Sequence, residues 1–243
     1  MTALLQTRAL SRRYGGILAV DRVDLAVAPR ELVCIIGPNG AGKSTLVGLV
    51  SGSIPPSAGE IHLAGVALTG RPLHAFCRHG IVRKFQGTNT FARLSVRDNL
   101  VVAGMAVASH RARPFPDPDE ILALIKLEPQ ADKLAEAISH GQRQWLEVGM
   151  TLMSQPELLL LDEPTAGMTV EGTREMAELI LRLRERLAIV VIEHDLAFVR
   201  SLDCRTLVMH QGAVIRDGSF AEIEQDHEVR DVYLGRGGRH AAH

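Results

Sequence analysis

Apolar residues in the second half of the chain form two short continuous runs with an amphipathic segment between them. Residues 158–161 are all leucine, and residues 188–192 read Ala-Ile-Val-Val-Ile. A continuous apolar run is typical of a strand that is buried on both faces. Residues 171–186 place apolar side chains at helical spacing, with Arg and Glu on the opposite face. Strand, helix and strand in this order predict a parallel sheet with a right-handed crossover.

The N-terminal part of the chain alternates in character and is rich in Leu, Val and Ala. We expect strands over residues 3–10 and 17–27, joined near Tyr14-Gly15-Gly16 as an antiparallel pair. Further strand-like runs occupy residues 32–36, 59–63, 66–68, 81–85, 207–209 and 213–215. The pattern therefore predicts antiparallel strands before the parallel sheet.

Strand signals fade between residues 87 and 153, and helix-like composition replaces them. Three segments predict helices, at residues 96–108, 119–127 and 141–153, with a proline-rich loop after the first. We therefore expect one domain. Its α/β core, with an antiparallel β part, would consist of residues 1–86 and 154–234. An inserted helical subdomain would span residues 87–153, and the tail at residues 235–243 would be frayed.

Composition narrows the class of protein. The 243 residues include 46% hydrophobic and 23% charged residues, and the formal net charge is −1, which does not imply a nucleic-acid partner. The three cysteines, Cys34, Cys77 and Cys204, are expected to be small core residues in a reducing compartment. No apolar run is long enough for a transmembrane helix. Any membrane role is therefore expected to be peripheral.

One loop carries the strongest chemical signal. It follows the apolar run at residues 32–36 and matches the pattern G-x-x-x-x-G-K-[ST] of phosphate-binding loops. Its glycines allow backbone N–H groups to approach phosphate oxygens, and the helix that follows favours negative charge. The lysine can reach the β- and γ-phosphates, and the serine hydroxyl can ligate Mg²⁺. The loop consists of Gly37, Pro38, Asn39, Gly40, Ala41, Gly42, Lys43, Ser44 and Thr45.

Polar residues follow three of the predicted strands. Because ligands bind beyond the carboxyl ends of parallel strands, these residues are expected beside the phosphate loop. Asp162 can hold Mg²⁺ and Glu163 can orient or deprotonate the attacking water. His194 can position that water and sense the terminal phosphate, although a histidine after a strand often has only a structural role. Gln86 can contact Mg²⁺ or the water and relay the nucleotide state to the helical insertion.

Two further candidates also have a structural interpretation. Tyr14 offers an aromatic face for stacking on adenine, but a strand tyrosine can equally be half-buried packing. Ser139 precedes a predicted helix, where serine is a good N-cap, yet the N–H groups of a helix start also bind anions. Because Ser139 lies in the helical insertion, a phosphate bound there is expected to belong to a second molecule.

These motifs occur in the order and spacing of ABC-transporter nucleotide-binding domains, which the chain resembles over residues 4–234. By that resemblance residues 37–45 are the Walker A loop, Gln86 the Q-loop glutamine, and Asp162 and Glu163 the Walker B pair. Four residues resemble the signature motif, namely Ser139, His140, Gly141 and Gln142.

The resemblance extends to two more site residues and to the architecture. His194 resembles the switch histidine, and Tyr14, with Val20 beside it, resembles the adenine-stacking aromatic residue. The family implies an α/β fold, in which a P-loop NTPase core with a RecA-like, mostly parallel sheet carries an N-terminal antiparallel β subdomain and an inserted helical subdomain. It also implies hydrolysis of ATP to ADP and phosphate with Mg²⁺ bound by Ser44, Gln86 and Asp162.

The resemblance implies partners as well. In this family two ATPase subunits pair head to tail, and each ATP lies between the Walker A loop of one chain and the signature motif of the other, in trans. Two transmembrane permease subunits and, indirectly, a solute-binding protein complete an importer. The chain would then be peripheral on the cytoplasmic face of the inner membrane, and nucleic acid is not expected as a partner.

Local sequences resemble the importers of branched-chain amino acids and urea, most of all the urea-importer ATPase. They are residues 81–86, 139–147, 166–169 and 232–235. Two positions depart from the usual family pattern. His140 stands where most members have Gly, and Thr169 stands where the loop after the Walker B motif usually ends in Asp. We interpret Thr169 as a sign of pairing with a different ATPase subunit.

Three other functions fit the phosphate loop less well. A soluble ABC-type ATPase acting on nucleic acid or ribosomes usually carries coiled coils, zinc modules or a second cassette, and none is found here. A nucleotide-binding regulator without turnover would not need both Glu163 and His194. A small-molecule kinase would not need the residues at 139–142.

Overall fold

A six-stranded sheet forms the centre of the molecule. The computed structural model describes residues 3–84, 90–108 and 115–234. The strand order is β10-β9-β3-β8-β7-β6; β6, β7, β8, β3 and β9 pair in parallel, and β10 pairs antiparallel with β9. The predicted parallel sheet is therefore confirmed. Its strands are β3 (Leu32–Ile36), β6 (Ile81–Lys84), β7 (Leu158–Asp162), β8 (Ala188–Ile192), β9 (Arg205–His210) and β10 (Ala213–Ser219).

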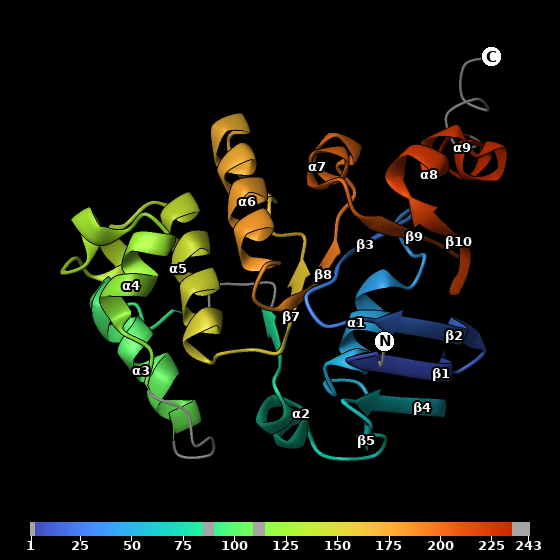
Figure 1. The fold of residues 1–243 in the computed structure, drawn as a ribbon, viewed down its shortest axis with the longest axis horizontal. Coiled ribbons are helices and arrows are strands. Elements are labelled where there is room, and N and C mark those ends of the chain that lie inside the picture. Colours follow the sequence, from blue (N-terminus) through green and yellow to red (C-terminus); the bar gives the residue numbers. More distant parts are fainter. Residues whose placement is uncertain (1–2, 85–89, 109–114, 235–243) are drawn as a thin grey trace.

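The predicted N-terminal antiparallel strands form a separate four-stranded sheet in the order β2-β1-β4-β5. Its strands are β1 (Leu5–Tyr14), β2 (Ile17–Val27), β4 (Ala58–Leu63) and β5 (Val66–Ala67). β1 pairs antiparallel with β2 and β4, with register shifts along both pairings. Figure 1 shows this sheet at the right, with α1 (Lys43–Val50) next to it.

Of the residues described between β6 and β7, three segments are α-helices and form the helical part of the chain, at the left of Figure 1. They are α3 (Val96–Ala108), α4 (Pro118–Leu124) and α5 (His140–Met153). Two short 3₁₀ helices, η1 (Glu128–Gln130) and η2 (Ala135–Ala137), lie between α4 and α5. The predicted helical segments are therefore present, although α4 ends before residue 127.

The remaining helices connect and flank the strands. They are α2 (Leu73–His79), α6 (Val170–Leu183), α7 (Leu196–Leu202), α8 (Phe220–Gln225) and α9 (His227–Leu234). Pro72 is the N-cap of α2, and its φ of −69° and ψ of 155° are extended. Gly80 ends this helix with φ +98°, a conformation that favours glycine.

Two hydrophobic clusters pack against opposite faces of the central sheet, because successive strand residues point to opposite sides. Leu32, Cys34 and Ile36 of β3 belong to the cluster that includes residues of α4, α5, α6 and α7. Val33 and Ile35 belong to the cluster that includes α1 and the antiparallel sheet. β3 is thus buried on both faces, which fixes the start of the phosphate loop.

The cysteines differ from expectation. Cys34 is buried and Cys204 is half-buried, but Cys77 is exposed on α2, so the prediction that all three are core residues is wrong for Cys77. In addition, the sulfur atoms of Cys34 and Cys204 lie 3.3 Å apart. Within the described ranges, no helix is long and apolar enough to cross a bilayer.

Candidate nucleotide site

The loop between β3 and α1 folds tightly against neighbouring backbone. Gly37 has φ +150° and Gly42 has φ +100°. A methyl group on Gly37 would collide with the carbonyl oxygen of Met209, and one on Gly42 with that of Ala19. Within the loop, the N–H of Ala41 donates to the carbonyl oxygen of Pro38 at 3.1 Å. The glycines are therefore required by both backbone conformation and close packing.

Helix α1 begins at Lys43, and Gly42 is its N-cap without a side-chain capping hydrogen bond. The N–H groups of a first helical turn have no partner within the helix. Leu46 is the first residue to donate back, to Gly42, at 2.9 Å. The helix start can therefore receive an anion, and this loop fits the phosphates of a nucleotide.

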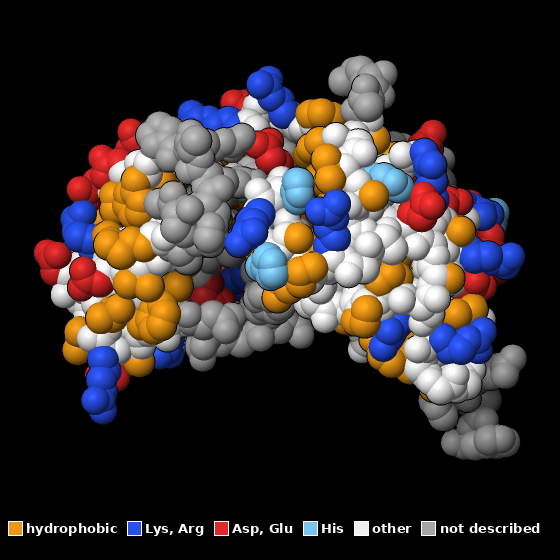
Figure 2. Space-filling model, turned by 90° about the horizontal axis from the view of Figure 1, so that it is seen from below, with side chains coloured by type: hydrophobic (Ala, Val, Ile, Leu, Met, Phe, Trp, Pro, Cys, Tyr) orange, Lys and Arg blue, Asp and Glu red, His pale blue; other side chains and the backbone are white. Residues whose placement is uncertain are grey.

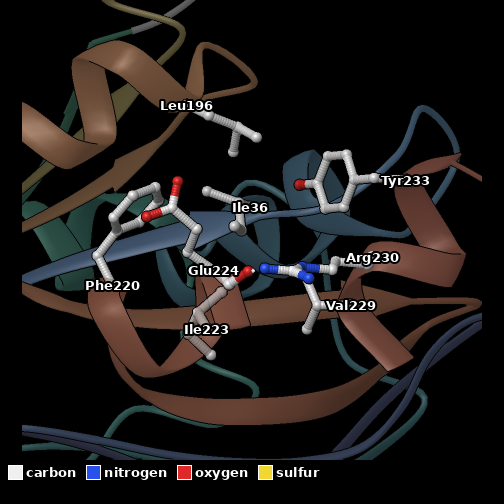
Figure 3. A pocket seen from close by; sticks show the side chains of 8 residues that line it. All are labelled: Ile36, Leu196, Phe220, Ile223, Glu224, Val229, Arg230 and Tyr233. Carbon is white, nitrogen blue, oxygen red and sulfur yellow. Dashed lines mark hydrogen bonds between the residues drawn. The ribbon is translucent and has the colours of Figure 1, made fainter. Parts of the chain in front are cut away.

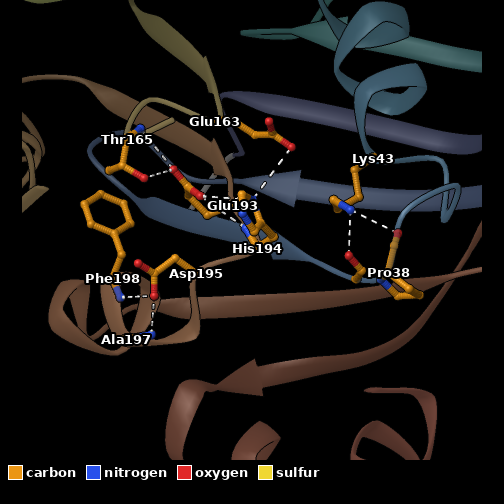
Figure 4. A network of polar contacts seen from close by, with 10 residues as sticks. Pro38, Lys43, Glu163, Thr165, Glu193, His194, Asp195, Ala197 and Phe198 are labelled. Atoms are coloured by element: carbon orange, nitrogen blue, oxygen red, sulfur yellow. Dashed lines mark hydrogen bonds and ion pairs between the residues drawn. The ribbon is translucent and has the colours of Figure 1, made fainter. Parts of the chain in front are cut away.

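Lys43 lies almost buried inside its own loop. Its Nζ donates to the carbonyl oxygens of Gly37 at 2.6 Å and Pro38 at 3.1 Å, as Figure 4 shows. Burial lowers the pKa of Lys43, and the negative charges of Glu163 and Asp162 act in the opposite direction. Both carboxylates therefore favour the charged form of the ammonium group.

Asp162 ends β7 with a side chain that is 0% exposed. Its Oδ2 accepts a hydrogen bond from Nη2 of Arg83 at 2.7 Å, and Arg83 lies on β6, the neighbouring strand. Its Oδ1 is also buried and has no hydrogen-bond partner among the described residues. A carboxylate oxygen without a donor fits a Mg²⁺ ion or one of its waters.

Glu163 and His194 meet where β7 and β8 end. Nδ1 of His194 lies 3.8 Å from Oε1 of Glu163 and 3.7 Å from Oε2 of Glu193. Figure 4 shows these side chains on the same side of the sheet as Lys43. Glu163 has φ +48°, a left-handed conformation that is uncommon outside glycine. The side chains of Lys43, Glu163 and His194 are thus gathered at one edge of the sheet.

Glu193 supports this arrangement, and the sequence motifs did not single it out. Its side chain is 0% exposed, and Oε1 accepts hydrogen bonds from the N–H and the hydroxyl of Thr165, at 3.1 and 2.6 Å. Its Oε2 accepts from the N–H of His194 at 3.2 Å. Glu193 therefore ties the loop after β7 to the loop after β8. A carboxylate directly after an apolar strand was the available signal.

Ser139 caps α5 as expected. Its hydroxyl accepts from the N–H of Gln142 at 3.2 Å, and the Gln142 side chain accepts from the N–H of Ser139 at 3.0 Å. This is a capping box. Among the described residues, no hydrogen bond or ion pair joins residues 139–142 to residues 37–45. His140 is exposed, and Gly141 has open space at its Cβ position.

Helix α5 is joined by polar contacts to the loop after β7 and to the end of β6. The side-chain amide of Gln144 donates to the carbonyl oxygen of Ala166, in the loop after β7, at 2.5 Å. Nζ of Lys84 lies 3.4 Å from Oε2 of Glu147, and both side chains are 8% exposed. Lys84 ends β6. These contacts connect the helix that Ser139 caps with β6 and with the loop after β7.

The remaining candidates are placed as follows. Tyr14 is 44% exposed at the end of β1, and the guanidinium of Arg12 lies 4.6 Å from its ring centroid. One face of the ring is thus covered by a cation. Val20 is fully buried on β2. Gln86 lies outside the described residues. Thr169 is the N-cap of α6, and its hydroxyl accepts from the N–H of Gly172 at 3.2 Å.

A separate cavity of about 390 Å³ lies beside the end of β3 (Figure 3). Burial raises the pKa of Tyr233 in its wall to about 12. Among the described residues, none of the phosphate loop lines it, and most of its wall is apolar, unlike a phosphate site. The lining residues are Ile36, Leu196, Phe220, Ile223, Glu224, Val229, Arg230 and Tyr233.

Known proteins are similar to this chain in sequence and in fold. The sequence profile described as ABC transporter matches residues 20–166. The high-affinity branched-chain amino acid transport ATP-binding protein BraF of Pseudomonas aeruginosa is 33% identical, and LivG of Escherichia coli K12 is 35% identical. Each alignment covers 96% of this chain and 98% of the relative.

Among solved structures, the ADP conformation of an ATP-binding cassette of an ABC transporter aligns with a TM-score of 0.85 and 26% identity. The alignment covers 97% of this chain and 100% of that chain. The expected P-loop NTPase fold is thereby confirmed. The phosphate loop, the carboxylates beside Lys43 and these similarities lead to one conclusion. The chain belongs to the ABC transporter family, as an ATP-binding subunit that uses ATP with Mg²⁺ and couples its hydrolysis to transport.

Proposed function

We propose that residues 37–45 hold the phosphates of ATP, with Lys43 on the β- and γ-phosphates. Ser44 and Asp162 are the proposed Mg²⁺ ligands, and Gln86 is proposed to join them. The uncapped start of α1 and the buried, unpaired Oδ1 of Asp162 support this assignment. On this proposal Lys43 leaves the carbonyl oxygens that it now contacts and donates to phosphate instead.

Tyr14 is proposed to stack on the adenine ring, with Val20 beside it. The stacking face would be the one that Arg12 does not cover. The exposed fraction of the tyrosine, 44%, supports this assignment because a ring face must be open to receive a base.

Hydrolysis is proposed to follow general-base chemistry, in which Glu163 orients and deprotonates a water that attacks the γ-phosphate. The observation that carries this proposal is the contact between Nδ1 of His194 and Oε1 of Glu163, 3.8 Å apart, on the same side of the sheet as Lys43. His194 would hold the glutamate and the water in line. Mg²⁺, when bound, supplies charge stabilisation at the phosphate oxygens.

The site is proposed to be completed in trans. A helix starts at Ser139, His140, Gly141 and Gln142, and a helix start favours anions. These residues nevertheless make no described contact with the phosphate loop of their own chain. We infer a head-to-tail pair in which these residues face the γ-phosphate held by a second, different ATPase subunit. The core at residues 1–86 and 154–234 and the helical subdomain at 87–153 would then act on different nucleotides.

The transported solute is proposed to be a small polar molecule taken up by an importer. The names of BraF and LivG favour branched-chain amino acids, and urea remains the alternative from local motifs. Two permease subunits, fed by a solute-binding protein, would hold the chain at the cytoplasmic face of the inner membrane. Figure 2 shows hydrophobic side chains gathered over the helical part, which would suit a permease contact. In the sequence between β6 and β7, the exposed large apolar residues among those described include Phe91, Met105, Phe115 and Leu134.

The substitution Glu163→Gln tests the mechanism. Removing a general base should lower turnover by at least about 10²-fold, while ATP binding remains. Turnover is measured in the assembled transporter, and ATP affinity in the purified chain. The control is Glu178→Gln, on the exposed surface of α6, which should leave turnover unchanged. Equal turnover in the two variants would remove Glu163 from this role.

The solute is tested by uptake into vesicles that contain the chain, its partner ATPase and candidate permease subunits. Labelled leucine and labelled urea are compared with the matching solute-binding protein present. ATP-dependent uptake of leucine alone would support the amino-acid assignment. Uptake of urea alone would overturn it in favour of the local motifs, and uptake of neither would contradict both.

A further inference from the structure

Two cysteines that are distant in the sequence meet beside the strand that leads into the phosphate loop. The sulfur atoms of Cys34 and Cys204 lie 3.3 Å apart. Cys34 lies within β3, and Cys204 directly precedes β9, the parallel neighbour of β3. Both belong to the hydrophobic cluster on the same face of the sheet. The fold therefore places two thiols in direct contact.

We propose that Cys34 and Cys204 are a redox-active pair that forms a reversible disulfide with peroxide as the oxidant, and that this disulfide weakens ATP binding. The proposal concerns a modification site outside the proposed catalytic residues. It does not depend on which solute the transporter carries.

The two thiols differ in ways that assign their order of reaction. A hydrogen bond with Cys34 is the main cause that lowers the pKa of Cys204, and Arg184 lowers it further. The same hydrogen bond, burial and the charge of Cys204 raise the pKa of Cys34. Cys204 is also the more accessible of the two. Because the thiolate is the nucleophile, Cys204 reacts with peroxide first.

The chemistry balances with one peroxide molecule. The Cys204 thiolate attacks a peroxide oxygen, so an S–O bond forms, the O–O bond breaks, and hydroxide leaves. The hydroxide released from the peroxide takes the proton of the Cys34 thiol and becomes water. The Cys34 thiolate then attacks the Cys204 sulfur, so the S–S bond forms, the S–O bond breaks and a second hydroxide leaves. A neutral sulfenic acid at Cys204 no longer opposes the ionisation of Cys34.

The disulfide would change the conformation of the phosphate loop, because β3 and β9 are tightly packed against each other where the loop begins. A disulfide bond is about 2 Å long, so bond formation draws the two sulfur atoms closer than they lie now. Cys34 shares β3 with Ile36, and Gly37 follows at once. Gly37 already lies so close to the carbonyl oxygen of Met209, on β9, that no side chain fits between them. A close-packed interior transmits a shift of β9 relative to β3 to this point.

The chemical test uses the full chain with Cys77→Ser, so that the exposed thiol on α2 cannot react. The protein is treated with graded hydrogen peroxide, free thiols are alkylated, and intact mass and peptide masses are measured. We expect both remaining thiols to be lost together, with a Cys34–Cys204 linked peptide that dithiothreitol removes. The control is Cys77→Ser with Cys204→Ser, in which Cys34 should stay free because the half-buried partner is gone.

The binding test measures the dissociation constant for fluorescent ATP in the same samples. Oxidation should raise it about tenfold, and reduction should restore it, while the Cys204→Ser control should not respond. Oxidation of Cys204 to sulfinic acid without the linked peptide would overturn the pair. A linked peptide with unchanged ATP affinity would overturn the switch.

Discussion

Among single residues, Arg83 is the clearest addition to the site. Its hydrogen bond to the fully buried Asp162 neutralises a carboxylate that lies away from water. Removing one partner of a buried ion pair leaves an uncompensated charge, at a cost of about 3–5 kcal/mol. We therefore expect Arg83→Gln to lower the free energy of unfolding by this amount, measured by urea denaturation of the nucleotide-free chain.

The matched control for Arg83 is Arg174→Gln. Arg174 also contacts carboxylates, those of Glu171 and Glu178, but all three side chains are exposed on α6. Exposed ion pairs contribute little to stability because water solvates both partners. The urea midpoint of this variant should stay close to that of the unmodified chain. If the two variants lost similar free energies of unfolding, burial of Asp162 would not explain the loss in Arg83→Gln.

Ser139 allows the capping role to be separated from the proposed role in trans. Ser139→Ala removes the side-chain acceptor and should cost about 1 kcal/mol of stability. Ser139→Asp keeps a good capping residue, so stability should be retained, but it places a negative charge against the proposed phosphate. We expect this variant to fold normally and to lose ATPase activity in the assembled transporter. Activity equal to that of the unmodified protein would contradict the contact in trans.

The candidate residues could be predicted from the sequence because each follows a strand or starts a helix. Such positions are occupied by Lys43, Asp162, Glu163 and His194. Their partners could not be predicted in this way. Whether a buried carboxylate such as Glu193 meets a particular donor depends on side-chain directions across neighbouring strands, which sequence spacing does not give.

At the scale of elements, the ion pair between Lys84 and Glu147 connects β6 with α5. Both side chains are 8% exposed. We expect Lys84→Met and Glu147→Met each to destabilise the chain by about 3–5 kcal/mol, because each leaves a buried charge. The double variant should be more stable than their summed losses predict. Urea unfolding of the four proteins gives this coupling as a double-mutant cycle.

The control for this cycle is the pair formed by Lys126 and Glu175, which also links the helical part to the core. Its side chains are 49% and 28% exposed, with the charged atoms 2.7 Å apart. A solvated pair should give a coupling below about 1 kcal/mol. If both cycles gave the same coupling free energy, burial would not strengthen the ion pair that connects α5 to β6.

Most elements were predicted from the spacing of apolar residues, and their ends were less well predicted. Helix α6 begins at Val170 because Thr169 caps it, one residue before the expected start. Helix α4 begins at Pro118 with Asp117 as its cap. A cap depends on the backbone conformation of one residue, which local composition does not fix. The pairing order of the strands likewise comes from contacts that are distant in the sequence.

At the scale of the whole molecule, the proposed site is incomplete in one chain. The isolated protein should therefore bind ATP but hydrolyse it slowly. Its turnover per chain should rise when the partner ATPase is added, because this increases the fraction of paired chains. Phosphate release measured over a titration with the partner checks this. Turnover that is already high without the partner would contradict completion in trans by a different subunit.

The fold of the whole chain could be predicted because its motifs and its strand and helix pattern agree. The solute could not be predicted by the same reasoning. The residues proposed to recognise ATP are read directly from the phosphate loop, but the solute is proposed to contact other subunits. The chemistry proposed for residues 37–45 and 162–194 is the same in an importer of amino acids and in an importer of urea. Those residues therefore do not distinguish the two solutes.

The central position of β3 has a consequence for synthesis of the protein. β3 lies between β8 and β9, which begin at Ala188 and Arg205, so the phosphate loop is translated long before its supporting neighbours. At about 5–20 residues per second, a ribosome needs several seconds or more to reach them. During that interval the nascent chain carries a complete phosphate motif without the sheet that holds it. We therefore expect nucleotide binding to be acquired late in translation, after the strands that flank β3 have been synthesised.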